Sequence, residues 1–280
     1  MVRKALIPVA GKGMRLRPVT SVVPKALFPL VDAAGGIKSV LHVICEQAIA
    51  SAVEHITIVV SPWQIDMVRQ YFDALCEGRF ARLPACIEYV IQTSPKGFGD
   101  AVLQGRSFVG DEPFLLLLGD HIQVEENGKP PCSAQVVQAF NSTGPVAMIG
   151  VQEVSRGELS KVGVASGRQI QQDIYRCTCF VEKPDLATAK EKLVTDGVAG
   201  NGFLAHCGIY IFTPEIFDCI AEISTMIPEP GKEVELADAQ ALLLRKYPEN
   251  YYLCKIAGRA YDVGTPAGYA SAQAAFRSRC

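Results

Sequence analysis

"KALIPVAGKGMRLRPVTSVVPKALFPLVD", residues 4–32, joins a short apolar run to a loop of glycines, prolines and basic side chains. The apolar run 4–10 has the length of a buried strand, and Gly11 and Gly13 end it at once. Glycine permits a tight turn and a close approach of the backbone to a ligand. Because open α/β sheets bind ligands at the carboxyl ends of their strands, this stretch predicts a ligand-binding loop after the first strand.

The first half of the chain goes on alternating strands with helices. Strand-like runs at 55–61 and 113–120 are accompanied by segments with helical apolar spacing at 39–53 and 65–78. Strands that alternate with helices are typical of parallel βαβ units, and the continuous apolar run "FLLLL" indicates a sheet covered on both faces. We therefore expect an α/β fold with a Rossmann-like, mixed and mostly parallel sheet and helices on both faces.

The pattern changes after about residue 150. Short strands, a hairpin-like pair around Gly167 and a long helix near Glu233–Tyr247 follow. No linker, repeat or low-complexity tract separates the two parts of the sequence. We expect a single domain, 1–280, with two halves at about 1–150 and about 151–280.

Composition and charge indicate which kinds of partner and which cell compartment to expect. The 27 basic and 29 acidic residues leave a formal net charge of −2, so no overall basic field indicates nucleic acid. The 10 cysteines form no CxxC pair and are typical of small core residues in a reducing compartment. The run "ALIPVA" breaks too early for a signal peptide, and no stretch approaches the ~20 apolar residues that span a membrane. We expect a cytoplasmic protein that binds neither nucleic acid nor a membrane.

The first loop carries groups suited to phosphate. Its backbone N–H groups, the forked guanidinium of Arg15 and the ammonium of Lys25 all favour anions. Pro24 stiffens the segment before Lys25, so this ammonium can be aimed. The loop is neither a GxxxxGK[ST] loop nor a GxGxxG dinucleotide loop, since residue 16 is Leu. We interpret it as a polyphosphate cradle, and a tight turn without a ligand is the alternative.

Two aspartates stand after strand-like runs. Asp120 ends "LLLLGD" and Asp262 lies in "YDVG". A carboxylate that faces phosphates can hold Mg²⁺, a hard cation that prefers oxygen ligands, and two of them could share one ion. Taken singly, each aspartate is more often a turn or cap residue.

Two further strand ends carry polar groups. In "FVEKP", Glu182 can accept hydrogen bonds from sugar hydroxyls and Lys183 can pair with a phosphate, while a surface ion pair is the alternative. In "IQTSPKGFGDA", Gln92 offers both a donor and an acceptor, as recognition of a base requires. Gly97 and Gly99 allow a flat base to lie against the backbone, and an ordinary loop between strand and helix is the alternative.

The order of these motifs resembles that of the sugar-1-phosphate nucleotidyltransferases, most closely the bacterial UTP–glucose-1-phosphate uridylyltransferases (UDP-glucose pyrophosphorylases). "IPVAGKGMRLRPVT" is similar to their IPVAGxGTRxxPxT, "VPKALFPLVD" to IPKEMLPLVD, "QTSPKGFGDA" to QxxxxGLGHA, "FVEKP" to xVEKP and "YDVGTPAGY" to xDxGxxxGY. The similarity extends from residue 4 to residue 272. It implies a glycosyltransferase-A-like nucleotidyltransferase fold, in which about 1–150 binds the nucleotide and about 151–280 the sugar phosphate.

The resemblance also implies roles for individual residues. The residues implied to bind the nucleotide are Ala10, Gly11, Lys12, Gly13, Gln92 and Gly97. The implied catalytic cations are Arg15, Lys25 and Lys183. The sugar phosphate is expected to contact Glu182, Gly163 and Lys183, and Mg²⁺ to bind Asp120 and Asp262. The implied partners are a nucleoside triphosphate and a sugar 1-phosphate, and a homo-oligomer is possible.

Several positions depart from the family pattern. Met14 replaces a Thr, Asp100 a His, His121 a second Asp and Val162 a Tyr, and Phe203 lies near an expected Asn. The phosphate and metal groups are kept, while base- and sugar-facing groups have changed. We expect an active enzyme that uses UTP and glucose 1-phosphate. The alternatives are dTTP or another nucleotide, another sugar, or a non-catalytic homologue that binds a nucleotide sugar.

Overall fold

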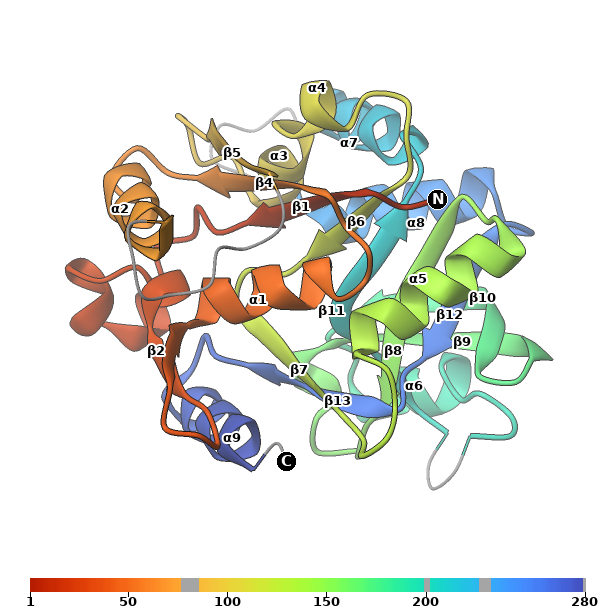
Figure 1. Ribbon diagram of the computed structural model, residues 1–280. Helices are drawn as coiled ribbons and strands as arrows, with labels where there is room; N and C mark the ends of the chain where they lie inside the picture. The colour runs from red at the N-terminus through yellow and green to blue at the C-terminus, as the bar shows by residue number, and fades with distance from the viewer. Residues whose placement is uncertain (77–85, 199–201, 227–232, 279–280) are drawn as a thin grey trace.

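A nine-stranded sheet forms the centre of the computed structural model, which describes residues 1–76, 86–198, 202–226 and 233–278 (Figure 1). Its strands run in the order β5-β4-β1-β6-β11-β8-β12-β10-β9. Their bounds are β1 Lys4–Pro8, β4 His55–Val60, β5 Cys86–Ile91, β6 Phe114–Leu117, β8 Ala147–Glu153, β9 Gly163–Gln171, β10 Ile174–Glu182, β11 Leu204–Phe212 and β12 Tyr251–Lys255.

The sheet is parallel in its first part and mixed in its second. β5, β4, β1 and β6 are parallel neighbours, with Ile7 of β1 opposite Ile58 of β4. β12 is parallel to β8, whereas β11 is antiparallel to β6 and β8, and β10 is antiparallel to β12 and β9. Parallel neighbours need a long crossover connection, and helices supply it in the first half. The expected α/β fold around a mixed sheet is confirmed.

Helices cover both faces of the sheet. One face carries α1 (Val40–Ile49), α2 (Ile65–Cys76) and α5 (Cys132–Thr143), and the other α3 (Phe98–Leu103), α7 (Glu215–Met226) and α8 (Leu236–Lys246). The other helices are α4 (Arg106–Val109), α6 (Leu186–Lys192) and α9 (Pro266–Arg277), with 3₁₀ turns η1 (Met14–Leu16), η2 (Val19–Ser21), η3 (Lys25–Leu27) and η4 (Leu159–Lys161). Among the helices described, none is long and apolar enough to cross a membrane.

Successive residues of β1 point into two different cores. Ala5 and Ile7 belong to the core on the α1 side, and Leu6 belongs to the core on the α8 side. Side chains of a strand alternate between its two faces, and a strand buried on both faces is apolar at every position. This explains the continuous apolar run with which the chain begins.

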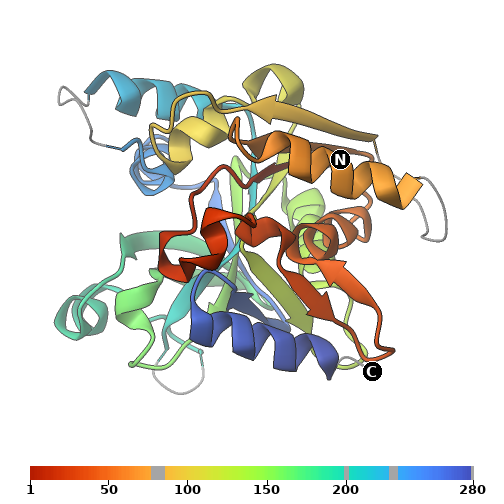
Figure 2. The same ribbon diagram turned by 90° about the vertical axis from the view of Figure 1, so that its left-hand side faces the viewer.

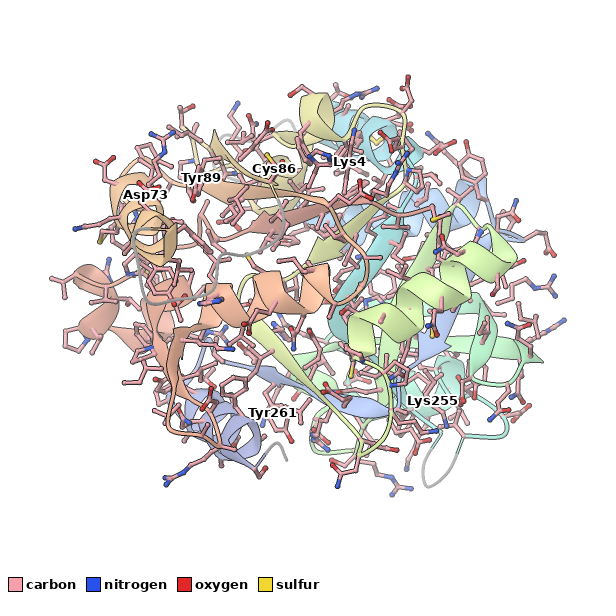
Figure 3. The ribbon with its side chains drawn as sticks, viewed as in Figure 1. Lys4, Asp73, Cys86, Tyr89, Lys255 and Tyr261 are labelled. Atoms are coloured by element: carbon pink, nitrogen blue, oxygen red, sulfur yellow. The ribbon has the colours of Figure 1, made fainter. Side chains whose placement is uncertain are left out.

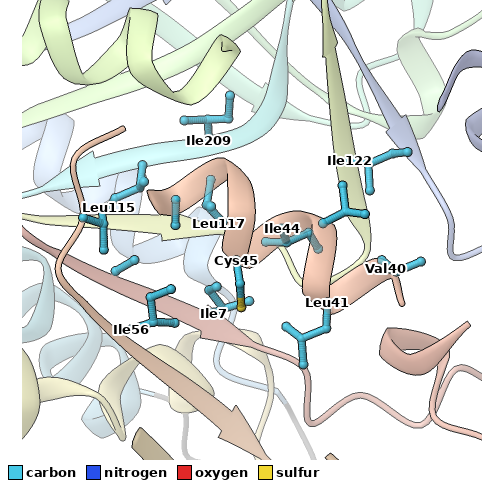
Figure 4. Close-up of a cluster of buried hydrophobic side chains, with 14 of the residues drawn as sticks. Ile7, Val40, Leu41, Ile44, Cys45, Ile56, Leu115, Leu117, Ile122 and Ile209 are labelled. Carbon is cyan, nitrogen blue, oxygen red and sulfur yellow. The ribbon is translucent and has the colours of Figure 1, made fainter. Parts of the chain in front are cut away.

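Helix α1 holds β1 in place. Ser39 caps its first turn, since its Oγ accepts the backbone N–H of His42 at 3.1 Å. Leu41 and Cys45 of this helix are fully buried and lie close to Ile7 (Figure 4). Full burial of a side chain such as Leu contributes about 1.5–3 kcal/mol. The start of the glycine loop is therefore anchored by the core beneath it.

A two-stranded ribbon, β7 (His121–Glu125) with β13 (Gly258–Asp262), lies beside the main sheet (Figure 1). Its register places Asp262 directly opposite His121. The ribbon thus brings two motifs from distant parts of the sequence next to each other.

The C-terminal helix fastens the end of the first loop. β2 (Pro29–Val31) and β3 (Ile37–Ser39) form a short hairpin there. The side-chain amide of Gln273 in α9 accepts from the N–H of Val31 at 3.0 Å and donates to its carbonyl at 2.9 Å. Figure 2 shows α9 running below the loop, so both ends of the chain contribute to this side of the molecule.

One expectation about the second half is wrong in detail. β9 and β10 form a hairpin, but its turn lies at Gln172 and Asp173 rather than around Gly167. Gly167 lies within β9, where an added Cβ would meet the carbonyl oxygen of Arg176 at 2.7 Å. This glycine therefore permits a close approach between strands and does not form the turn.

The amino end of β1 is closed by Lys4, which Figure 3 labels. Its ammonium donates to the carbonyl oxygens of Phe108 and Val109 at 3.1 and 2.9 Å and pairs with Glu112 at 2.9 Å. This basic side chain is engaged by the protein itself. Lys4 is therefore a structural residue at the amino end of β1, whereas the glycine loop lies at its carboxyl end.

Candidate active site

The loop after β1 lies at the carboxyl edge of the sheet, which faces the viewer in Figure 2. Gly13 has a φ of 62°, and its carbonyl accepts a hydrogen bond from Thr20 Oγ1 at 2.8 Å. A Cβ on Gly13 would lie 2.9 Å from Thr20 Cγ2, so backbone and packing both require glycine. The carbonyl of Gly11 accepts from Gln64 Nε2 at 3.3 Å. These contacts define the shape of the loop.

Lys25, in η3, forms an ion pair with Asp120, which follows β6. The two side chains are only 15% and 19% exposed. A Cβ on Gly11 would lie 3.9 Å from Lys25 Nζ, so the ammonium lies against the glycine loop. The pair joins residues 95 positions apart in the chain. Sequence analysis assigned Lys25 to a phosphate and Asp120 to a metal ion, and the structure brings the two together.

His121 completes the surroundings of Asp120. Its Nδ1 lies 2.9 Å from Asp120 Oδ1, while Lys25 bonds the other carboxylate oxygen. Burial favours the neutral acid, but the charge of Lys25 and the hydrogen bond from His121 hold the pKa of Asp120 well below its usual range. Burial also opposes a charged imidazole, yet the hydrogen bond and charge of Asp120 and the charge of Asp262 raise the pKa of His121. Asp120 is therefore an anion near neutral pH.

Asp120, His121 and Asp262 form a cluster that can hold a metal ion. One ligand atom from each lies within 4.8 Å of the others. Asp262 Oδ1 also accepts the N–H of Gly264 at 2.6 Å, which fixes this carboxylate. Two carboxylates suit Mg²⁺, whereas a histidine nitrogen suits it poorly. His121 therefore fits better as the group that orients Asp120, a role that sequence analysis did not foresee.

Arg15 approaches the same carboxylates from the loop. Its Nη2 lies 3.7 Å from Asp262 Oδ2. A Cβ on Gly264 would lie 2.7 Å from both Arg15 Nη2 and Asp262 Oδ1, and 3.4 Å from Asp120 Oδ2. Cations and carboxylates thus meet around one glycine. This mixture of charges can bind anionic oxygens and a divalent cation side by side.

The segment between β5 and α3 holds Gln92 in one orientation. Gln92 is buried, and its Nε2 donates to Asp100 Oδ2 at 2.6 Å and to the carbonyl of Gly97 at 3.2 Å. Asp100, noted from the sequence only as a departure, therefore sets which way the amide points. With both amide hydrogens directed at protein acceptors, Gln92 has its carbonyl oxygen to offer to a ligand.

The two glycines of this segment pack against the chain just before α8. Gly97 has a φ of 108°, and the N–H of Gly99 donates to the carbonyl of Val234 at 2.7 Å. A Cβ on Gly97 would lie 2.7 Å from the backbone N and O of Val234. The structure thus gives these glycines a packing role, in addition to the expected approach of a base.

The end of β10 brings together the three residues that were expected to contact the sugar phosphate. Glu182 lies opposite Gly163, and a Cβ on Gly163 would be 2.8 Å from Glu182 Oε2. Lys183 has a φ of 48°, and its Nζ lies 3.5 Å from Glu182 Oε1. Its side chain is 62% exposed, so the ammonium remains open to a ligand.

Glu235 links the glycine segment to the end of β10. Burial raises the pKa of Glu235, and the charge of Glu233 adds to this effect while that of Lys183 opposes it. Glu235 directly follows Val234, which packs on Gly97, and the charges of Lys183 and Glu182 also act on its carboxylate. The residues expected to bind the base and those expected to bind the sugar phosphate are therefore linked through the chain just before α8.

Residues 4–279 match the nucleotidyl transferase family. The chain belongs to this family. A relative from Staphylococcus saprophyticus, named UTP–glucose-1-phosphate uridylyltransferase 2, is 33% identical, with 96% of this chain and 89% of the relative covered. A UTP–glucose-1-phosphate uridylyltransferase from Mycoplasma genitalium is 31% identical, with coverages of 97% and 90%. The crystal structure of a UDP-glucose pyrophosphorylase complexed with UDP-glucose matches with a TM-score of 0.80 at 28% identity, over 99% of this chain and 98% of that chain.

Other residues singled out in this nucleotidyltransferase are placed as follows. Ala10 is half-buried and Lys12 is exposed, both within the glycine loop. Phe203, which lies near an expected Asn, is 2% exposed and packs with Leu159 and Leu193 in a small separate core. This departure from the family pattern is therefore a packing residue in the described structure.

Two aromatic residues beside Glu182 were missed by sequence analysis. The ring of His206 stacks on that of Phe180 with centroids 4.8 Å apart. His206 Nδ1 also lies near Gly163, 3.4 Å from the position of an added Cβ. The available signal was a histidine within the otherwise apolar strand "FLAHCGIYIF".

The packing role of Gly97 gives a test in this nucleotidyltransferase. Gly97→Ala is expected to lower the free energy of unfolding by about 1–3 kcal/mol, because the new Cβ meets Val234 in a strained backbone region. It should also raise KM for the nucleoside triphosphate, since the segment that holds Gln92 must shift. Denaturant unfolding and steady-state kinetics measure the two effects.

Gly110→Ala is the matched control. Gly110 also has a positive φ, 62°, but nothing lies within 4 Å of its added Cβ. Its loss of stability should reflect backbone strain alone, and KM should stay unchanged. Equal stability losses and equal KM values in the two variants would contradict the role given to the Val234 contact.

Proposed function

We propose that this nucleotidyltransferase transfers the uridylyl group of UTP to glucose 1-phosphate, which yields UDP-glucose and pyrophosphate. Two relatives bear the name of this activity. The observation that carries the proposal is the cluster against the glycine loop, where Lys25 pairs with Asp120 and Arg15 lies 3.7 Å from Asp262. It combines cations for phosphate oxygens with carboxylates for a metal ion in one partly buried place.

The reaction needs positioning and charge neutralisation more than acid–base chemistry. A phosphate oxygen of the sugar 1-phosphate attacks the α-phosphorus of UTP, and pyrophosphate leaves. Both reactants are anions, so Arg15 and Lys25 on the nucleotide side and Lys183 on the sugar side offset their repulsion. The attacking phosphate is already ionised and requires no protein base. Orienting two reactants can lower a barrier by roughly 7–11 kcal/mol.

Asp120 and Asp262 are the residues that fit Mg²⁺, which supplies further neutralisation of phosphate charge when bound. The hydrogen bond from His121 keeps one oxygen of Asp120 oriented. Lys25 bonds the other oxygen in the structure. A triphosphate offers Lys25 a second set of anionic oxygens, so substrate binding can free Asp120 for the cation.

The amide of Gln92 supports uracil as the base. Its two N–H groups point to Gly97 and Asp100, which leaves the carbonyl as an acceptor. Uracil and thymine present a ring N–H between two carbonyl groups. Adenine and cytosine have no ring N–H on that edge, and guanine has its ring N–H between a carbonyl group and an amino group. The second candidate is therefore the same reaction with dTTP. A non-catalytic homologue is disfavoured because Lys25, Asp120 and Asp262 are all present and converge.

A pyrophosphate-release assay tests this proposal. UTP, dTTP, ATP, GTP and CTP are each combined with glucose 1-phosphate and with other sugar 1-phosphates, in the presence of Mg²⁺. UTP with glucose 1-phosphate is expected to give the highest kcat/KM, with dTTP weaker. Use of ATP or GTP that equals or exceeds the use of UTP would refute uracil as the preferred base, and no release with any pair would refute the activity.

A further inference from the structure

A row of three residues crosses three neighbouring strands beside Lys183. Glu182 of β10 lies opposite Gly163 of β9. β11 pairs with β9 through Ala205 and Val164, which brings His206, the next residue, alongside Gly163. Laterally paired residues point to the same face of a sheet. Glu182 and His206 therefore stand on either side of a position that has no side chain.

The space above Gly163 is bordered by polar atoms. A Cβ on this glycine would lie 2.8 Å from Glu182 Oε2, 3.3 Å from Phe180 Cε2 and 3.4 Å from His206 Nδ1, so an aromatic edge lies beside the two polar groups. Any larger residue would fill the gap between the two. The glycine thus keeps open a small space with a carboxylate on one side and an imidazole nitrogen on the other.

Packing holds the imidazole of His206 in one orientation. Its ring lies nearly parallel to that of Phe180, at 17° and 4.8 Å, and meets the ring of Tyr210 edge-on at 5.8 Å. The residue is 9% exposed. Its Nε2 is buried and has no hydrogen-bond partner among the described residues. The ring is therefore fixed by its aromatic neighbours.

The same surroundings decide where the proton sits. Burial lowers the pKa of His206 to about 4, so the imidazole is neutral near pH 7 and carries one N–H. A buried N–H without a partner costs about 1–3 kcal/mol, which disfavours the proton on Nε2. This favours the tautomer with its proton on Nδ1, the ring nitrogen that lies near Gly163.

We propose that His206 is a specificity residue for the sugar. Its Nδ1–H donates to a ring hydroxyl oxygen of the sugar 1-phosphate, while Glu182 accepts from a neighbouring hydroxyl. A donor and an acceptor across a small gap match two adjacent hydroxyls of a pyranose, and Lys183 follows directly with a cation for the phosphate. This inference rests on the proposed function and adds to it the residue that selects the sugar.

The test compares glucose 1-phosphate with its 2-, 3-, 4- and 6-deoxy analogues. His206→Phe keeps an aromatic ring on Phe180 but removes the N–H. It is expected to lower kcat/KM for glucose 1-phosphate by about 10–100-fold, the usual range for one lost hydrogen bond to substrate, mainly through KM. The deoxy analogue that lacks the hydroxyl bound by His206 should have a similar kcat/KM in the wild type and in His206→Phe. Its disadvantage relative to glucose 1-phosphate, present in the wild type, should therefore largely disappear in the variant. KM for UTP should stay unchanged.

His206→Asn is the rescue variant, because its amide N–H₂ lies close to the position of imidazole Nδ1. It should retain part of the discrimination that His206→Phe loses. If His206→Phe fails to fold, His206→Gln, whose N–H₂ is displaced by one bond, must show the loss instead. If the wild type is active and a folded variant shows the same ratios of kcat/KM between glucose 1-phosphate and each deoxy analogue, the role of His206 is overturned. The proposed function is then unaffected. A wild type inactive with every sugar 1-phosphate overturns the proposed function, and this inference with it.

Discussion

Lys25→Gln is expected to lower turnover by about 10²–10³, the scale of losing one preorganised electrostatic partner, while nucleotide affinity falls far less. Negative charge builds up on the pyrophosphate as it leaves, so a fixed ammonium is worth more in the transition state than in the ground state. Lys25 is only 15% exposed and lies against the glycine loop, which restricts where its charge can move. Turnover, nucleotide binding and melting temperature measured on one preparation test this expectation.

Lys38→Gln is the matched control, because it also removes a lysine from an ion pair. Lys38 Nζ lies 2.7 Å from Glu46 Oε1, and the two side chains are 32% and 37% exposed. Such a pair contributes about 0–1 kcal/mol, so turnover should not change. Lys25→Arg should restore part of the activity, since a planar fork does not replace a point charge. A folded Lys25→Gln variant with normal turnover would contradict the catalytic role.

Asp120→Asn and Asp262→Asn are each expected to abolish Mg²⁺-dependent turnover. Each removes one carboxylate from a cluster whose ligand atoms lie within 4.8 Å, and with it charge neutralisation worth several kcal/mol. Asp120→Asn should also lower stability more than Asp262→Asn, because it leaves the largely buried Lys25 without its anion. Metal titration monitored by calorimetry, with and without UTP, gives a readout that is independent of turnover.

Asp218→Asn provides the control for these two substitutions. Asp218 of α7 forms an exposed ion pair with Arg106 of α4 at 2.8 Å. This variant should bind Mg²⁺ with UTP and turn over as the wild type does. Near-normal rates at saturating Mg²⁺ in both Asp120→Asn and Asp262→Asn would remove the metal assignment.

The class of fold and the place of the candidate site could be predicted from the sequence because both predictions depend on local patterns. An apolar run closed by Gly11 and Gly13 predicts a buried strand followed by a loop at the carboxyl edge, and the structure has both. Asp120 was expected at such an edge and lies there. The order of motifs along the chain indicated the family, and the match over residues 4–279 confirms it.

Partners across the sheet were not predictable, because they depend on how distant strands pair. Lys25 forms a hydrogen bond with Asp120, which is 95 positions away in the chain. This contact depends on the fold, because the fold places η3 beside the end of β6. His121 orients Asp120 and Asp100 orients Gln92 through side-chain geometry that a list of motifs does not contain.

The sequence by itself determined the alternation of strands and helices, the glycine loop and the residue types at the strand ends. These follow from spacing along the chain, which sets the face and length of each element. Only the tertiary structure decided that Phe203 packs into a core while His206 faces Glu182 across Gly163. The physical reason is that lateral register among β9, β10 and β11 selects which side chains meet, and a shift by one residue would turn each of them to the opposite face.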